Sequence, residues 1–152
     1  MRLWVDADAA PCDVKEIVYR AARRLELDTV LVANRPLRVP QNNPFVRSVS
    51  VPGGPDAADQ HIAEAAEPGD VAITADIPLA AILVERRVSV IDPRGDEYTP
   101  ENVGERLAVR DFMEGLRGAN VETGGAAAYG EKDKRAFAGA LDRVLTRVLR
   151  GR

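Results

Sequence analysis

The chain opens, after Met1, with Arg2-Leu-Trp-Val-Asp-Ala-Asp-Ala-Ala-Pro11. The short apolar run from Arg2 to Val5, closed by two aspartates, is typical of a buried strand that ends in a turn. After Pro11 the apolar residues follow a period of 3.6, with 14, 17, 18, 21, 22 and 25 on one helical face. Proline suits the first turn of a helix because its missing N–H has no partner there. A strand followed so closely by a helix predicts the start of a βαβ unit.

The same alternation continues along the chain. We expect further strands over 30–33, 45–51, 71–74 and 88–91. Helices are expected from Asp56, over Leu79–Glu85, from Thr99 as cap to about Leu116, and from Lys132 to Arg150. Alternating strands and helices favour a mostly parallel sheet of about five strands between two helical layers, an α/β/α sandwich. With no internal repeat or long linker, residues 1–152 are expected to form one domain, on which the last helix packs.

Composition and charge argue against several classes of protein. The chain has 24 acidic and 21 basic residues and a net charge of -3, which argues against binding nucleic acid through bulk charge alone. Cys12 is the only cysteine, so no internal disulfide can form. No stretch approaches the roughly 20 apolar residues of a membrane helix, and the N-terminus does not resemble a signal peptide. We therefore expect a cytoplasmic protein without a membrane segment.

Aspartates gather where apolar strands end or the next helix begins. They are Asp6, Asp8, Asp56, Asp59 and Asp76, with Asp92 as a possible further acid. Ligands of parallel sheets bind beyond the carboxyl ends of the strands, so these acids are expected to converge there. Hard carboxylate oxygens suit Mg²⁺ or Mn²⁺, which need only one to three protein carboxylates. We expect Asp6, Asp59 and Asp76 to hold the ion, and Asp6, Asp8 and Asp76 to act in phosphodiester chemistry.

Each of these aspartates also has a purely structural interpretation, because Asp is common in turns and helix caps. Asp56, which follows Gly-Gly-Pro, is the residue most simply explained in this way. The other candidates are residues for binding phosphate or substrate: Asn34, Arg94, Arg110, Thr123, Gly124 and Gly125. Backbone N–H groups in the turns at 92–95 and 123–125 could bind an anion. Plain turns explain these segments as well, and an ion-paired helix face explains Arg110. No G-x-G-x-x-G or Walker pattern is present.

Several segments, in this order along the chain, resemble the YaiI/YqxD family of small bacterial proteins of uncharacterised function. They are Trp4-Val-Asp-Ala-Asp-Ala-Ala-Pro11, Val32-Ala-Asn34, Asp56-Ala-Ala-Asp59, Thr74-Ala-Asp-Ile-Pro-Leu-Ala80, Pro93-Arg-Gly95, Arg110-Asp-Phe-Met113 and Thr123-Gly-Gly125. The resemblance implies a PIN-like α/β/α domain, a fold whose characterised members are Mg²⁺- or Mn²⁺-dependent ribonucleases with clustered acids. By position, Asp6 is then the first metal acid, Asp59 or Asp56 the second and Asp76 the third. The family often has Ala-Cys-Pro in the first loop, whereas here Ala10 replaces that cysteine and Cys12 follows the proline.

Three functions remain open on this evidence. The first is a metal-dependent nuclease acting on RNA or another phosphodiester. The second is a non-catalytic module that binds RNA or a protein, with the aspartates serving as caps and turns. The third is a phosphatase of the haloacid-dehalogenase type, since Asp6-x-Asp8 after a first strand resembles its nucleophile and acid, although no well-placed lysine follows. The oligomeric state is not indicated by the sequence.

Overall fold

The computed structural model describes residues 1–54, 56–119 and 128–151. In chain order the elements are β1 (Arg2–Asp6), α1 (Cys12–Leu25), β2 (Asp28–Ala33), β3 (Val46–Ser50), α2 (Ala57–Ala65), β4 (Val71–Ile73), α3 (Ile77–Glu85), β5 (Ser89–Ile91), β6 (Glu97–Tyr98), α4 (Val103–Gly118) and α5 (Glu131–Arg150). The predicted alternation of strands and helices is confirmed, and each expected element is present within a few residues of its predicted bounds.

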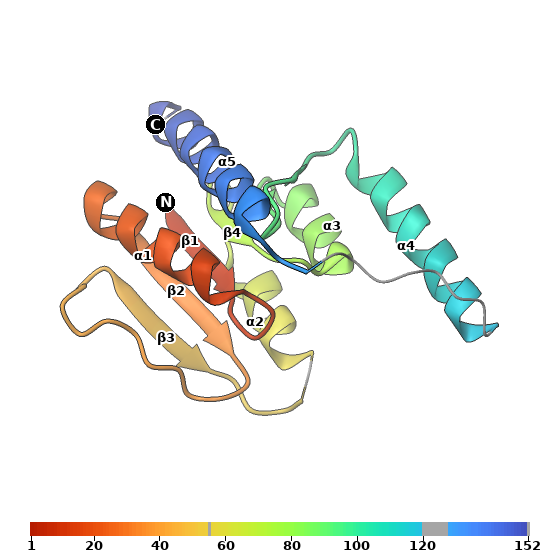
Figure 1. Ribbon diagram of the computed structural model, residues 1–152, viewed down its shortest axis with the longest axis horizontal. Coiled ribbons are helices and arrows are strands. Elements are labelled where there is room, and N and C mark those ends of the chain that lie inside the picture. Colours follow the sequence, from red (N-terminus) through yellow and green to blue (C-terminus); the bar gives the residue numbers. More distant parts are fainter. Residues whose placement is uncertain (55, 120–127, 152) are drawn as a thin grey trace.

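The strands form one sheet in the order β3-β2-β1-β4-β5-β6 (Figure 1). β1 lies at the centre and pairs in parallel with β2 and β4, so that Asp6 is level with Val32 and Val5 is level with Ile73. All pairs are parallel except that of β5 with β6. The chain after β1 and the chain after β4 therefore leave the sheet side by side at its carboxyl edge, where the candidate acids lie.

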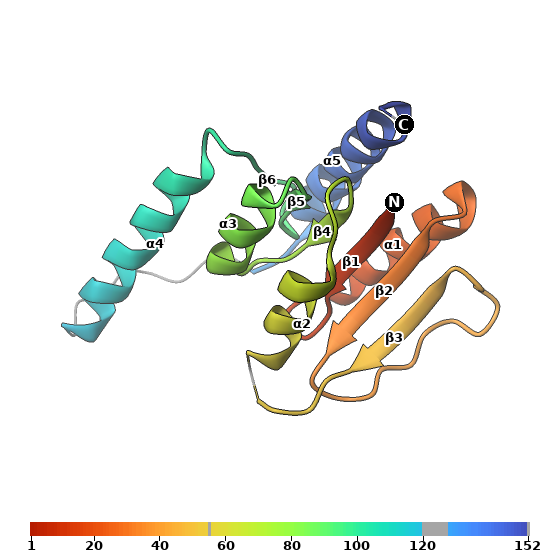
Figure 2. The same ribbon diagram turned by 180° about the vertical axis from the view of Figure 1, so that it is seen from behind.

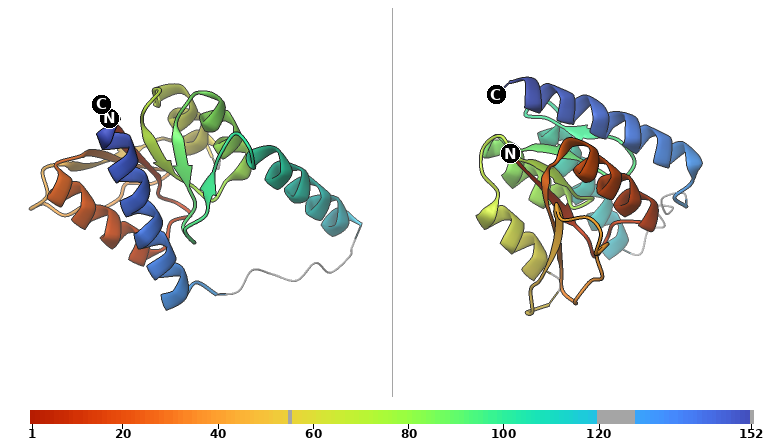
Figure 3. Two further views of the ribbon diagram at one scale, coloured as in Figure 1. Left: turned by 90° about the horizontal axis from the view of Figure 1, so that it is seen from above. Right: turned by 90° about the vertical axis from the view of Figure 1, so that its left-hand side faces the viewer.

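Two helical layers cover the sheet, which is consistent with the expected three-layer sandwich. Leu3 and Val5 of β1 face a core shared with α1 and α5, and Trp4 between them faces a second core shared with α2 and α3. Figure 3 shows α1 and α5 on one side of the sheet and α2 on the other. α5 presents a fully buried face to the first core, formed by Phe137, Ala140, Leu141, Val144 and Leu145.

The region after β5 differs from the sequence prediction. A sixth, antiparallel strand at Glu97–Tyr98 follows a tight turn, visible in Figure 2. The helix predicted to follow a Thr99 cap begins at Val103 instead. Thr99 and Asn102 bond each other across a turn: the Thr99 N–H donates to Asn102 Oδ1 at 2.9 Å, and the Asn102 N–H donates to Thr99 Oγ1 at 3.2 Å. The side chain expected to cap the helix therefore closes the turn before it.

Helix α4 projects from the body of the molecule (Figures 1 and 3). It packs mainly on α3 and buries none of its own residues. Val109 and Phe112 on its outer side are 56% and 66% exposed. Within the described residues, no helix is both long and apolar enough to cross a membrane.

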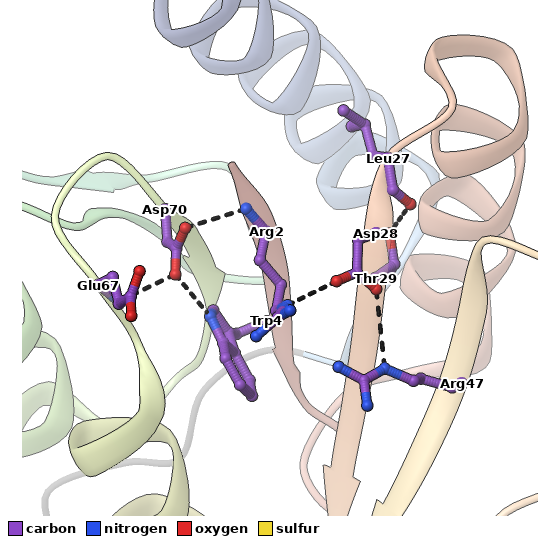
Figure 4. A network of polar contacts seen from close by, with 8 residues as sticks. All are labelled: Arg2, Trp4, Leu27, Asp28, Thr29, Arg47, Glu67 and Asp70. Atoms are coloured by element: carbon purple, nitrogen blue, oxygen red, sulfur yellow. Dashed lines mark hydrogen bonds and ion pairs between the residues drawn. The ribbon is translucent and has the colours of Figure 1, made fainter.

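A polar network joins the strands at the edge opposite the candidate acids (Figure 4). The Asp70 carboxylate accepts hydrogen bonds from the Arg2 N–H at 2.9 Å, Trp4 Nε1 at 3.0 Å and the Glu67 N–H at 2.9 Å. Asp28 on β2 pairs with Arg2 at 2.6 Å. Asp70 is buried, and its carboxylate satisfies all three of these N–H donors. The network therefore fixes β1 against the start of β4.

Candidate functional site

Asp6 is the last residue of the central strand and is only 7% exposed. Thr74, which follows β4, donates a hydrogen bond from Oγ1 to Asp6 Oδ2 at 3.0 Å. The same Thr74 oxygen accepts the N–H of Asp76 at 3.0 Å. Thr74 therefore links the end of β1 to the loop that carries Asp76.

Asp76 begins helix α3. Its Oδ1 accepts the N–H of Leu79 at 2.9 Å, and Pro78 occupies the first turn. The expectation that a strand-end aspartate serves as a helix cap therefore holds for Asp76. This capping bond also fixes the direction of the carboxylate toward the carboxyl edge of the sheet.

Asp8 and Asn34 join the loops that follow β1 and β2. The Asn34 N–H donates to Asp8 Oδ2 at 2.9 Å. In the described part of the chain, Asn34 Oδ1 is the one buried side-chain polar atom without a hydrogen-bond partner. A buried acceptor without a donor is unfavourable, and it is ordinarily explained by a partner such as water or an ion.

Asp59 lies in the first turn of α2 and faces the other acids. Burial raises its pKa to about 8, helped by a hydrogen bond with Asp76 and by the charges of Asp76, Asp6 and Asp56. Burial also raises the pKa of Asp6, against the hydrogen bond from Thr74, and the charges of Asp76 and Asp8 raise it further. Neighbouring carboxylates disfavour one another's charge, so Asp59 keeps its proton near neutral pH unless a cation compensates the charges around it.

Asp6, Asp8, Asn34, Asp59 and Asp76 line one hollow of about 390 Å³ at the carboxyl edge. A second hollow, of about 310 Å³, adjoins it, because Asp59 and Asp76 line both. Residues of α2 and α3 and their N-cap aspartates line most of this open hollow, and α4 contributes Arg110. We call them the acidic hollow and the helical hollow.

The side chains are not arranged as a ready-made metal cage. Within residues 1–54, 56–119 and 128–151, no group of three or more His, Cys, Asp or Glu side chains is placed to hold one metal ion. The acidic hollow therefore offers hard oxygen donors without a closed coordination shell. Such a site suits a cation that keeps most of its own waters, as Mg²⁺ does.

The remaining candidates lie in different surroundings. Asp56 occupies the N-cap position of α2 without a capping hydrogen bond, and it lines the helical hollow. Asp92 closes its own turn, since its Oδ1 accepts the N–H groups of Arg94 at 2.9 Å and Asp96 at 3.0 Å. Arg94 pairs with Asp133 at 3.0 Å and lies over the Tyr129 ring, so Asp92 and Arg94 belong to the contact with α5. Thr123, Gly124 and Gly125 lie outside the described residues.

Sequence reasoning gave Thr74 no role of its own and did not predict the helical hollow. Thr74 carries a visible signal, since it is a hydroxyl residue at the end of an apolar strand, two positions before an aspartate. Gln60 and Ile82 carry none, because an exposed glutamine and an apolar residue on a helix are ordinary features. Only the packing of α2, α3 and α4 brings them to one place.

Comparison with known proteins shows the family to which this chain belongs. The model of a family described as "Uncharacterized BCR, YaiI/YqxD family" matches residues 4–147. The chain belongs to this family. The resemblance inferred from the sequence segments is thus confirmed.

Full-length relatives within the family are about half identical to this chain. A UPF0178 protein of Myxococcus xanthus is 53% identical over 150 residues, covering 99% of this chain and 97% of the relative. Those of Halorhodospira halophila and Dechloromonas aromatica are 52% and 49% identical, each covering 97% of this chain and 97% and 98% of the relative. No solved structure is significantly similar to the chain. Family membership leaves the reaction open, so function is argued from the site.

Proposed function

We propose that this protein is a divalent-metal-dependent phosphodiesterase that acts as a ribonuclease. The observation that carries this proposal is the gathering of Asp6, Asp8, Asp59 and Asp76 around one hollow at the carboxyl ends of β1 and β4. In open α/β sheets this edge is the usual ligand site. The α/β/α architecture is also consistent with the PIN-like fold that the family resemblance implies.

Two features of the acidic hollow fit Mg²⁺ or Mn²⁺. The described residues that line it include carboxylates and an amide but no basic side chain, so nothing in the lining compensates the acids. Asn34 Oδ1 is a buried oxygen without a donor, and an amide oxygen is a suitable ligand for these ions. The absence of a closed group of three acids among the described residues fits an ion held by one or two carboxylates and water.

The roles follow from position. Asp6 and Asp76, whose carboxylates are fixed by hydrogen bonds, hold the ion, Asp59 reaches it through one of its waters, and Asp8 accepts a proton from the attacking water. When bound, a divalent cation neutralises phosphoryl charge and makes bound water more acidic. Thr74 and the Leu79 N–H keep the carboxylates of Asp6 and Asp76 in fixed orientations before substrate arrives, which avoids reorganisation during reaction.

One observation favours the non-catalytic alternative. Asp76 caps α3 and Asp8 bonds the backbone of Asn34, so both aspartates have a structural use in the absence of any ligand. A phosphatase of the haloacid-dehalogenase type has weaker support. Among the described residues that line the two hollows, Arg110 is the only basic one, and that mechanism needs a lysine beside the nucleophile.

Cleavage of a short, unpaired, end-labelled RNA tests the proposal. The wild-type protein is expected to cleave it with Mn²⁺ or Mg²⁺ and to stop when EDTA is added. Asp6→Asn should lower the rate by roughly 100-fold or more, the scale of a lost metal or electrostatic group. Asp92→Asn is the matched control, because it removes the same charge at the same sheet edge from a carboxylate used in its own turn. Cleavage that persists in EDTA or in folded Asp6→Asn would refute the proposal.

A further inference from the structure

The helical hollow differs in character from the acidic hollow beside it. Four apolar residues line it, Ala63 of α2 and Pro78, Leu79 and Ile82 of α3, together with five polar or charged ones: Asp56, Asp59, Gln60, Asp76 and Arg110. Ile82 is 48% exposed, although large apolar side chains are usually covered. Apolar side chains beside polar groups that can bond a ligand are common in small-molecule sites, and about 310 Å³ lies at the lower end of the usual size range.

Arg110 brings a positive charge to this hollow from a separate helix. Its guanidinium pairs with Asp111 and Glu114, each at 3.0 Å, and its side chain is 34% exposed. The two ion pairs orient the guanidinium and also neutralise much of its charge. With its charge largely neutralised, Arg110 does not draw a long polyanion to the hollow as a basic groove does.

We propose that the helical hollow binds the nucleoside next to the reacting phosphate, so that the enzyme acts on single, unpaired nucleotide units of a strand. This inference rests on the proposed function, because the phosphate is placed at the acids that the two hollows share. The apolar surfaces of Pro78 and Ile82 contact the base or ribose, and the Gln60 amide offers hydrogen bonds to a base edge. A base inside a duplex is stacked and paired, so only an unpaired nucleotide can place its base against Gln60 and Ile82 in this hollow.

The test compares three phosphate monoesters, which a phosphodiesterase does not cleave. Methyl phosphate reports the phosphate site alone, and adenosine 5′- and 3′-monophosphates add a nucleoside on either side. Binding is measured by calorimetry in saturating Mg²⁺. We expect one of the two nucleotides to bind about tenfold more tightly than methyl phosphate, the scale of contacts to one base.

Ile82→Ser should remove this tenfold advantage and leave methyl phosphate binding unchanged, since serine adds no charge. Val109→Ser is the matched control, because Val109 is equally apolar, 56% exposed, and lies outside the lining of the hollow. If neither nucleotide binds more tightly than methyl phosphate, or if Ile82→Ser keeps the advantage, the inference is wrong and the proposed function stands. If neither Mg²⁺ nor methyl phosphate binds, the proposed function fails and this inference fails with it.

Discussion

Asp59 is the acid whose folded environment is least favourable to a negative charge. Its pKa rises to about 8, first through burial and then through Asp76 and the neighbouring charges. In the unfolded chain the same carboxyl ionises near its ordinary value of 3.8. The folded state therefore holds a proton that the unfolded state loses, and stability falls as pH rises from about 4 to about 8.

Asp59→Asn should remove this loss. Urea unfolding in EDTA at pH 5 and pH 8 measures the effect. We expect the free energy of unfolding of the wild type to fall between the two pH values by about 1 kcal/mol more than that of the variant, a value reduced for solvent screening of a half-buried group. Equal pH dependence of the two proteins would show that Asp59 ionises normally and that the acids do not crowd one another.

At the opposite edge of the sheet, Asp70 is a buried carboxylate and Asp28 a half-exposed one. Replacing each in turn compares how much a buried and an exposed carboxylate contribute to stability. Asp70→Ala leaves the Arg2, Trp4 and Glu67 N–H groups without their acceptor and is expected to lower the free energy of unfolding by about 2 to 4 kcal/mol. Asp28→Ala removes a bridge whose side chains are 43% and 44% exposed, and about 0.5 kcal/mol is expected. Chemical denaturation of both variants provides the comparison, and equal losses would contradict it.

At the scale of elements, the turn before β6 sets how closely α5 can pack. Gly95 has a φ of +94°, and a Cβ there would lie 2.6 Å from the backbone carbonyl of Ala136. Gly95→Ala therefore combines an unfavourable backbone conformation with a clash, and a loss of roughly 3 kcal/mol is expected. A substitution at Gly54 carries the backbone effect without the clash, because its φ is +97° and no described atom lies within 4 Å of a Cβ there.

Gly54→Ala should accordingly lower the free energy of unfolding by only about 1 kcal/mol. Thermal unfolding of both variants measures the difference. Equal destabilisation would mean that the α5 backbone moves away from residue 95 at little cost. The close contact between the turn and α5 would then not be a fixed feature of the fold.

Helix α4 is the element held least firmly by the core. None of its residues is buried, whereas α5 buries Phe137, Leu141 and Leu145 among others. Its backbone amides over 109–118 should exchange with deuterium faster than those over 139–148, since local opening there exposes little apolar surface. Mass spectrometry of peptic fragments measures this. Equal protection would indicate that another molecule covers the outer face of α4 in solution.

For the whole molecule, much of the architecture could be predicted from periodicity and from the rule that parallel strands end at one edge. Repeated β and α patterns predict the sandwich, and their order brings the loops after β1 and β4 together. The two-residue strand β6 was missed because so short a segment has no period of its own. The start of α4 was misplaced because the Thr99 hydroxyl satisfies a turn rather than a helix end.

The candidate site, too, could be predicted from the sequence only in part. Aspartates after apolar strands can be recognised in sequence, and so can their shared edge. Which of them face one another depends on tertiary packing: Asp59 meets Asp76 and Asp6, whereas the Asp92 carboxylate turns back into its own loop. The helical hollow depends on α4, whose apolar periodicity indicates a contact face but not the helix that it contacts.

The measurement that tests the central claim most directly is Mn²⁺ binding by calorimetry. It compares the wild type, Asp6→Asn/Asp76→Asn and the control Asp92→Asn/Asp96→Asn, which removes equal charge from the turn before β6, with folding checked by circular dichroism. We predict that the wild type and the control bind Mn²⁺ and that the Asp6/Asp76 variant binds at least about tenfold more weakly. A wild type that does not bind Mn²⁺, or an Asp6/Asp76 variant that binds it equally well, would contradict the assignment of these acids as a metal site.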